Sequence, residues 1–157
     1  MHTYAENVHT VVGIAPQANG VELVGDFVSL KNANHIAVVC TIKQGHATPV
    51  EVLLEQAKDV DGTDADTVTK VVPIFETPNA LSTDVMQRVA DDANSYNSGA
   101  DLADKLVIFE VDVMKLDIND GFTCLRAKVP ASNAANIVSV NYVATGLRYS
   151  GKSMITD

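Results

Sequence analysis

Tryptophan is absent from this chain of 157 residues, cysteine occurs twice, and only 11 lysine and arginine residues stand against 20 aspartate and glutamate. The net charge of −9 opposes any general affinity for nucleic acid, because phosphate binding requires clustered basic side chains. Aromatic residues make up 5% of the chain, which disfavours a carbohydrate site, since such sites generally use an exposed aromatic platform. Hydrophobic residues still make up 46%, which predicts a folded chain with a core.

Long hydrophobic runs are also missing. No segment reaches the roughly 18 consecutive apolar residues of a membrane helix. Met1–Thr10 contains two histidines and a glutamate where a signal peptide needs a basic start and an apolar stretch. We therefore expect a soluble protein, made in a cytoplasm and not bound to a membrane. In that setting Cys40 and Cys124 are expected to be buried, reduced thiols.

Short β-prone runs closed by Gly, Pro, Asn or Asp recur along the whole chain. His35–Lys43 alternates strictly, with apolar residues at every even position, and Val107–Val113 does the same at odd positions. Strict alternation is typical of strands with one buried face. The sequence therefore predicts one all-β domain over residues 1–157, an antiparallel β-sandwich or jelly-roll-like barrel of about eight or nine strands. The termini, about 1–7 and 151–157, are expected to be short flexible or docking segments.

The predicted strands are Val8–Ala15, Val21–Leu30, His35–Gln44, Val50–Val60, Val68–Phe75, Asp84–Ala90, Lys105–Val113, Phe122–Val129 and Ile137–Arg148. Two of them, Val21–Leu30 and Ile137–Arg148, are predicted as exposed sheet edges. Val113–Asp117 is long enough for one helical turn. The apolar phase changes within Phe122–Val129, which predicts a β-bulge there.

One motif resembles a nucleotide-binding loop. Gly146–Ser153 fits the pattern G-x-x-x-x-G-K-[ST], which holds phosphates because the loop leads into a helix whose first amides bind them. Only Met154–Asp157 follows, so there is no room for that helix. We interpret the match as chance and expect no cofactor.

Other polar groups are equally poor candidates for chemistry. His35, Cys40 and His46 cannot form a zinc site on one strand, because residues five apart project from opposite faces. The acidic stretch Asp59–Asp66 could bind calcium through carboxylate oxygens, but its spacing departs from the EF-hand loop, and a solvated turn is the preferred interpretation. Asp91 and Asp92 are interpreted as a polar turn. We therefore expect no catalytic, cofactor-binding or metal-binding residues, and no enzyme.

Three segments in the first two thirds of the chain are distinctive: Leu54–Gly62, Val71–Phe75 and Leu106–Asp112. Four more follow in the C-terminal third: Leu116-Asp117, Gly121–Leu125, Ser132–Ser139 and Leu147–Tyr149. Together they resemble a family of small virion structural proteins of tailed bacteriophages; the C-terminal third is the closest part, and its segments appear in the family's order. The resemblance spans most of the chain, and its motifs are turns and strand ends. It implies a protein of the particle, found in the virion on the capsid surface and encoded near the major capsid protein.

Capsid decoration is the role that this resemblance implies. The expected partner is the major capsid protein, and we expect a homo-oligomer on the particle that stabilises the shell. A head-to-tail connector or tail protein is the alternative, since these are also β-rich virion parts. A carbohydrate-binding or host-attachment module is the third possibility.

Overall fold

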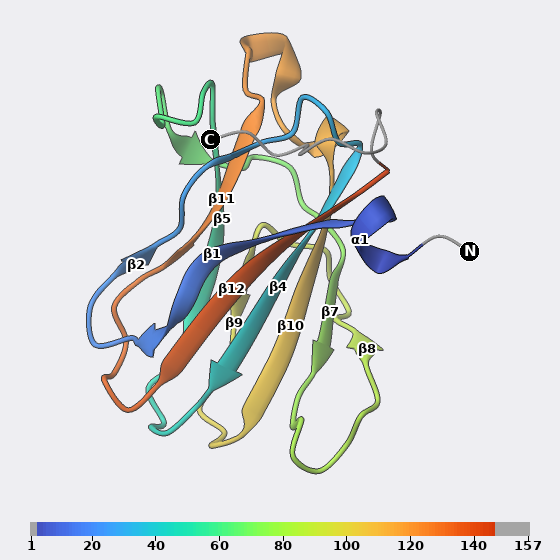
Figure 1. Ribbon diagram of the computed structural model, residues 1–157. Helices are drawn as coiled ribbons and strands as arrows, with labels where there is room; N and C mark the ends of the chain where they lie inside the picture. The colour runs from blue at the N-terminus through green and yellow to red at the C-terminus, as the bar shows by residue number, and fades with distance from the viewer. Residues whose placement is uncertain (1–2, 147–157) are drawn as a thin grey trace.

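The computed structural model describes residues 3–146, which form a sandwich of two antiparallel sheets (Figure 1). Sheet A has the order β1 (His9–Ala18), β12 (Ile137–Thr145), β4 (His35–Lys43), β10 (Asp104–Asp112), β7 (Ile74–Thr77) and β8 (Gln87–Arg88). Sheet B has the order β2 (Leu23–Val24), β11 (Cys124–Val129), β5 (Glu51–Ala57) and β6 (Asp66–Thr67), with β3 (Val28–Ser29) also on β11 and β9 (Ser95–Asn97) also on β5. The predicted all-β sandwich is confirmed.

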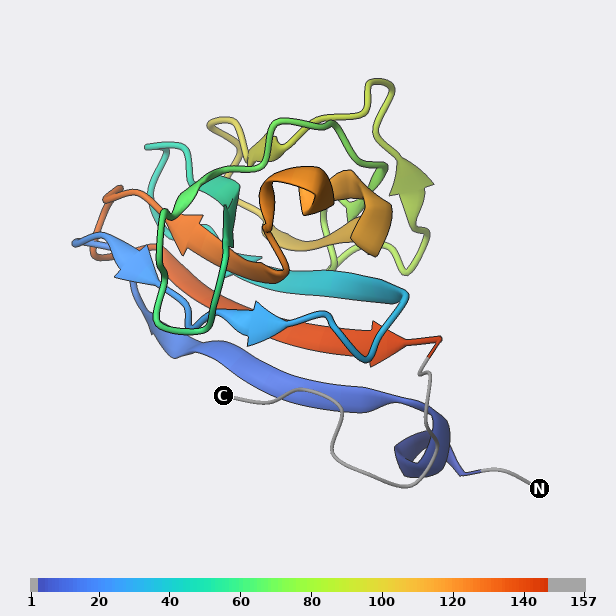
Figure 2. The ribbon, with the colours of Figure 1, turned by 90° about the horizontal axis from the view of Figure 1, so that it is seen from above.

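Three long strands, β12, β4 and β10, form the centre of sheet A and pair along their whole lengths. Seen from above, β1, β12, β4 and β10 follow one another across the sheet (Figure 2). The alternation predicted for β4 is confirmed, since all of its even positions are fully buried: Ile36, Val38, Cys40 and Ile42. The prediction that Ile137–Arg148 is a sheet edge was wrong, because β12 lies between β1 and β4. Residues 147 and 148 lie outside the described part.

The shorter strands differ most from expectation. The run Val21–Leu30 lies at an edge of sheet B as predicted, but it is divided into β2 and β3. Val68–Phe75 is not one strand: residues 68–73 form a connection with one isolated β-bridge at Val72, and β7 begins at Ile74. Asp84–Ala90 contributes only the two residues of β8. β6 and β9 were not predicted, because two or three residues are too few to show alternation.

Helical structure among residues 3–146 is limited to single turns. α1 (Tyr4–Asn7) precedes β1, and the 3-10 turns η1 (Val113–Lys115) and η2 (Ile118–Asp120) connect β10 to β11. η1 confirms the predicted helical turn, and Gly121 ends η2 in the left-handed region at φ 89°, which glycine adopts without strain. Within this described part, no helix is both long and apolar enough to cross a membrane.

The change of apolar phase in β11 has a different cause from the predicted bulge. The register between β11 and β5 runs without interruption from Cys124 to Lys128, so the bulge prediction was wrong there. Leu125 faces the main core, whereas Cys124 faces outward and packs with Phe27 and Ala57 in a second small hydrophobic cluster. Both faces of this end of β11 therefore carry apolar side chains. In the sequence, this looks like a change in which alternate positions are apolar.

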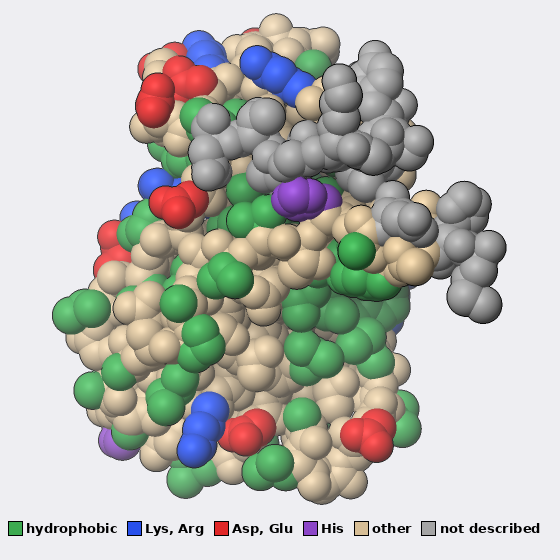
Figure 3. All heavy atoms as spheres, viewed as in Figure 1, with side chains coloured by type: hydrophobic (Ala, Val, Ile, Leu, Met, Phe, Trp, Pro, Cys, Tyr) green, Lys and Arg blue, Asp and Glu red, His purple; other side chains and the backbone are tan. Residues whose placement is uncertain are grey.

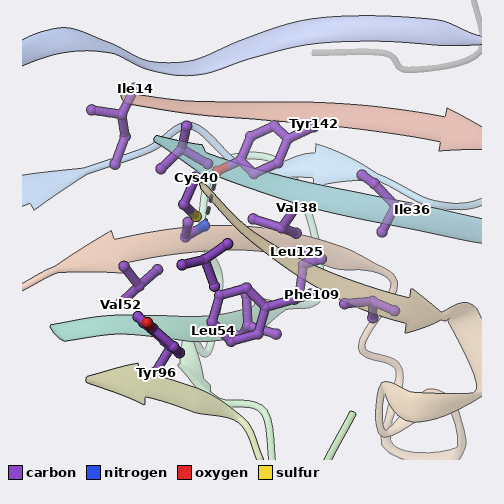
Figure 4. Packing of buried hydrophobic residues seen from close by; sticks show 14 of the residues in the cluster. Ile14, Ile36, Val38, Cys40, Val52, Leu54, Tyr96, Phe109, Leu125 and Tyr142 are labelled. Carbon is purple, nitrogen blue, oxygen red and sulfur yellow. Dashed lines mark hydrogen bonds between the residues drawn. The ribbon is translucent and has the colours of Figure 1, made fainter. Parts of the chain in front are cut away.

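The main core lies between the sheets and draws on residues from Ile14 to Ala144. Its largest fully buried side chain is Tyr142 of β12, whose hydroxyl accepts a hydrogen bond of 2.8 Å from the backbone N–H of Ala127 in β11 (Figure 4). Tyr142 thus joins the two sheets. Burial raises the pKa of Tyr142, so its hydroxyl stays protonated near neutral pH.

Both cysteines are buried and free, as predicted. Cys40 lies among the core residues of sheet A, and burial raises the pKa of its thiol to about 12. Cys124 lies in the second cluster, and burial raises its pKa also. Neither sulfur has the lowered pKa of a reactive thiolate, so both act as small hydrophobic side chains.

Candidate docking surfaces and polar sites

The three residues considered for zinc do not converge. His35 lies on the outer face of β4, where its Nε2 is 2.8 Å from Oε2 of Glu110, while Cys40 is completely buried on the inner face. The ring of His46 bonds instead to Thr48. Within residues 3–146, no group of three or more His, Cys, Asp or Glu side chains is placed to hold a metal ion.

The carboxylates of the acidic turn point to separate local partners. Asp59 accepts a hydrogen bond of 2.9 Å from the N–H of Thr63, and hydrogen bonds from Thr63 lower the pKa of Asp59. Asp64 forms an ion pair of 2.7 Å with Lys58. The stretch is thus a turn that caps its own backbone, with Gly62 in the left-handed region at φ 84°, in agreement with the preferred interpretation.

Two further sequence motifs remain: the polar turn at Asp91 and Asp92, and the nucleotide-loop match. Asp92 accepts from Arg88 at 2.7 Å in an exposed ion pair, and Asp91 lies beside a separate pocket. The nucleotide-loop match begins at Gly146, the last described residue, so Gly146–Ser153 otherwise lies outside the described residues. The same holds for the terminal segment 151–157 and for residues 1 and 2.

A pocket of about 400 Å³ opens where β9 faces β7 and the start of β10. The hydroxyl of Tyr96 donates to Oε2 of Glu76 at 2.6 Å, and burial followed by this bond raises the pKa of Tyr96. Lys105, 4% exposed, donates to the carbonyl of Asp101 at 3.0 Å and to Oε1 of Gln44 at 3.4 Å. These bonds tie the pocket walls together, which makes its polar groups structural partners of one another.

The outer face of sheet B is covered by paired charges. Glu55 accepts from Arg126 at 2.7 Å, and its other oxygen lies 3.7 Å from Nζ of Lys128. Lys128 also lies 3.3 Å from Glu22, while the guanidinium of Arg126 stacks 4.3 Å from the ring centroid of Phe27. This network is what a solvent-facing sheet surface is expected to carry.

The outer face of sheet A is different, because its centre carries no charge. A row of direct cross-strand neighbours crosses five strands as Val12, Asn141, Val39, Ile108 and Phe75. We call the seven outward apolar side chains of this region the sheet A face: Val12, Ala37, Val39, Phe75, Leu106, Ile108 and Val143. In Figure 3 hydrophobic side chains gather on the right-hand side, where Figure 1 places β10 and β7.

A second apolar surface lies at one end of the sandwich. The loop between β7 and β8 protrudes at the lower right of Figure 1, and the N–H of Ala80 in this loop donates to the carbonyl of Asp104 at 2.7 Å. That bond holds the loop beside the start of β10. We call the four exposed apolar side chains around it the apolar tip: Leu81, Val85, Met86 and Leu102, of which Leu81 is 81% exposed.

Sequence reasoning missed both surfaces. The sequence does contain a signal for the sheet A face. In the two alternating runs, apolar residues also occupy positions on the solvent-facing side: Ala37, Val39, Leu106 and Ile108. For the apolar tip there is none, since Leu81, Val85 and Met86 lie in or beside a run predicted as a strand, and only the tertiary fold exposes them.

Comparison with known proteins gives little more. No protein family matches the chain, and no curated protein matches it. Among solved structures, the SPBc2 prophage-derived protein YomS is similar at 10% identity and a TM-score of 0.48, over 89% of this chain and 94% of that one. A likeness of this size assigns neither a family nor a function to the chain.

Proposed function

We propose that this chain is a non-enzymatic virion structural protein of a tailed bacteriophage, and that it binds and stabilises the major capsid lattice as a decoration protein. The observation that carries the proposal is the apolar tip, a set of exposed apolar side chains on a rigid, acidic β-sandwich. The sequence resemblance to small phage virion proteins supports the same role. Exposed apolar side chains that gather in one place are typical of protein contacts.

Backbone hydrogen bonds hold the loop of the apolar tip in shape. Asn79 shapes the loop, since its carbonyl accepts from the N–H groups of Ser82 and Thr83, each at 3.1 Å. Because the loop is ordered before binding, little conformational entropy is lost on docking. Full burial of a leucine side chain is worth about 1.5–3 kcal/mol. Burial of Leu81 and Leu102 therefore provides a useful affinity for each of many lattice sites.

Binding to shells that lack the protein tests this proposal. Purified protein is expected to saturate such shells at a fixed ratio to the major capsid protein and to raise their resistance to heat, because a ligand of the intact lattice shifts the equilibrium away from disrupted states. Leu81→Asp and Leu102→Asp should each weaken binding at least tenfold, since a charge replaces a buried leucine.

The control is Val21→Asp, which places the same charge on another exposed apolar residue, between β1 and β2. This variant should bind as the unchanged protein does. Failure of the unchanged protein to bind shells would contradict the proposal. Location at the portal vertex or along the tail at ring stoichiometry would instead favour the connector or tail alternative.

A further inference from the structure

The outer surface of sheet A, with the sheet A face at its centre, is wide enough for a protein partner. The described strands β12, β4 and β10 have nine residues each, and β1 has ten. At ~4.8 Å between strands and ~3.4 Å per residue, these four strands cover roughly 600 Å². A standard protein interface buries ~800 Å² on each partner. Once part of β7 is added, the outer surface of sheet A has nearly the area that a specific dimer needs.

The charges that β4 and β10 carry on the outer surface lie at the two ends of this face. His35 contacts Glu110 at one end and lies directly opposite Asp112. At the other end, Lys43 lies directly opposite Asp104 on the neighbouring strand. Most of the chain repels a second copy, because each carries a net charge of −9. The sheet A face is a region where two copies can approach without bringing like charges together.

Register also makes the face complementary to itself. Consider a two-fold axis that lies above the face, parallel to the strands and midway between β4 and β10. This axis places β4 of one copy over β10 of the other, so each residue of β4 meets, in the second copy, the residue that is its cross-strand neighbour within one copy. Val39 then packs over Ile108 of the second copy, and Lys43 lies over its Asp104. Two such sheets would pack face to face about 10 Å apart, as in the interior of a sandwich.

Edge-to-edge pairing is a poorer route to a dimer. β1, at one edge of sheet A, contains Pro16 and has register irregularities between Val12 and Ile14 and between Ile14 and Gln17. Proline and bulges are the usual devices that block strand addition. At the other edge β8 has only two residues. The face, not an edge, is the part of sheet A that can accept a partner.

We propose that the sheet A face is a self-association surface, and that two copies of this chain pack on it around a two-fold axis parallel to β4 and β10. The dimer uses the outer surface of sheet A, whereas the proposed capsid contact uses the apolar tip. The dimer is measured on purified protein without shells, so its failure can be distinguished from a failure of capsid binding.

Sedimentation velocity of the full chain from about 1 to 100 μM tests the dimer. The unchanged protein should shift from monomer to dimer within this range. Raising the salt from about 50 to 500 mM should not weaken the dimer, because the contact is apolar and the repulsion between the acidic bodies is screened. A monomer at every concentration would overturn the proposal, as would dissociation by salt.

Two matched valines locate the interface. The proposed axis also exchanges β1 with β8, so Val12 lies over Arg88 of the second copy. Val12→Lys alters the sheet A face, and Val24→Lys makes the same change on the outer face of sheet B; the two side chains are 60% and 45% exposed, so both variants should fold. Val12→Lys should raise the dissociation constant at least tenfold, since the new charge is buried against a like charge on both sides of the axis. Val24→Lys should leave the dissociation constant unchanged.

Other results would assign the surface differently. Equal weakening by both substitutions would show that the contact is not on sheet A. If the full chain is a monomer and a chain ending at Gly146 is a dimer, the occupant of the face is the segment 147–157. Either result would overturn the proposed dimer.

Discussion

Tyr142→Phe is the most informative single perturbation of this fold, because it removes one oxygen atom that joins the two sheets. The hydroxyl of Tyr142 accepts from the N–H of Ala127 at 2.8 Å, and the side chain is fully buried. Without the hydroxyl, the N–H of Ala127 has lost its hydrogen-bond partner inside the core. Leaving a buried donor unsatisfied costs about 1–3 kcal/mol. We expect the free energy of unfolding to fall by that amount.

Two glycines that pack against Tyr142 allow the role of its hydroxyl oxygen to be separated from the role of its ring. A Cβ at Gly25 would lie 2.5 Å from the hydroxyl oxygen of Tyr142 and 3.1 Å from the carbonyl oxygen of Ala127. A Cβ at Gly13 would lie 2.5 Å from two ring carbons of the same tyrosine. Gly25→Ala and Gly13→Ala should therefore each destabilise the protein, by about 1–3 kcal/mol for an overpacked core.

The Tyr142→Phe background should separate the two glycines. It removes the oxygen that Gly25→Ala would contact, so the penalty of that substitution should fall by roughly 1 kcal/mol. The penalty of Gly13→Ala should fall less, because its Cβ would lie 2.9 Å from the same oxygen but 2.5 Å from two ring carbons that remain. Urea unfolding at constant m value measures each corner of the cycle. Equal penalties in both backgrounds, or an unchanged stability of Tyr142→Phe, would refute this account of the core.

Three further predictions follow from individual residues. Cys40→Ser should cost roughly 1–3 kcal/mol in thermal or urea unfolding, since it places a hydroxyl among fully buried apolar side chains. Asp117→Asn should make the free energy of unfolding fall less steeply as the pH is lowered. Hydrogen bonds from Gln56 and then Thr69 lower the pKa of Asp117 in the folded protein. The carboxylate therefore contributes its full stabilisation above its ordinary pKa of 3.8 and loses it as the pH falls through the lower pKa of the folded state. An equally steep acid transition in the variant would contradict this. Purified protein should bind no ATP in calorimetry, and binding that Lys152→Ala abolishes would show that the loop match is functional.

Alternation predicted the long strands well because each of them buries one face against the other sheet. β4 and β10 have fully buried residues at every second position over most of their lengths, so the period of two is visible without any structure. The position of β12 could not be read in the same way. Its sequence has the pattern of a half-buried strand. That pattern is the same at an edge and in the centre of a sheet, because backbone hydrogen bonding to a neighbouring strand does not depend on the side chains.

Short strands and polar clusters escaped prediction for another reason. β8 and β9 exist because β7 and β5 offer them paired backbone groups, and this is a tertiary effect on runs too short to have a period. The network around Asp117 joins it to Gln56, 61 residues earlier in the chain. No spacing rule connects two such residues, so only the fold could reveal their contact.

The contrast between the two outer faces separates what folding requires from what it does not. A sandwich needs one apolar face on each sheet, and both inner faces supply it. Sheet B then covers its outer face with paired charges around Glu55, which shows how this chain protects a sheet from association. Sheet A carries Val39 and Ile108, both half-buried, in the equivalent outward positions, and apolar surface that gathers on one face promotes association. Because the core does not need these side chains, their presence is best explained by a protein contact on the sheet A face.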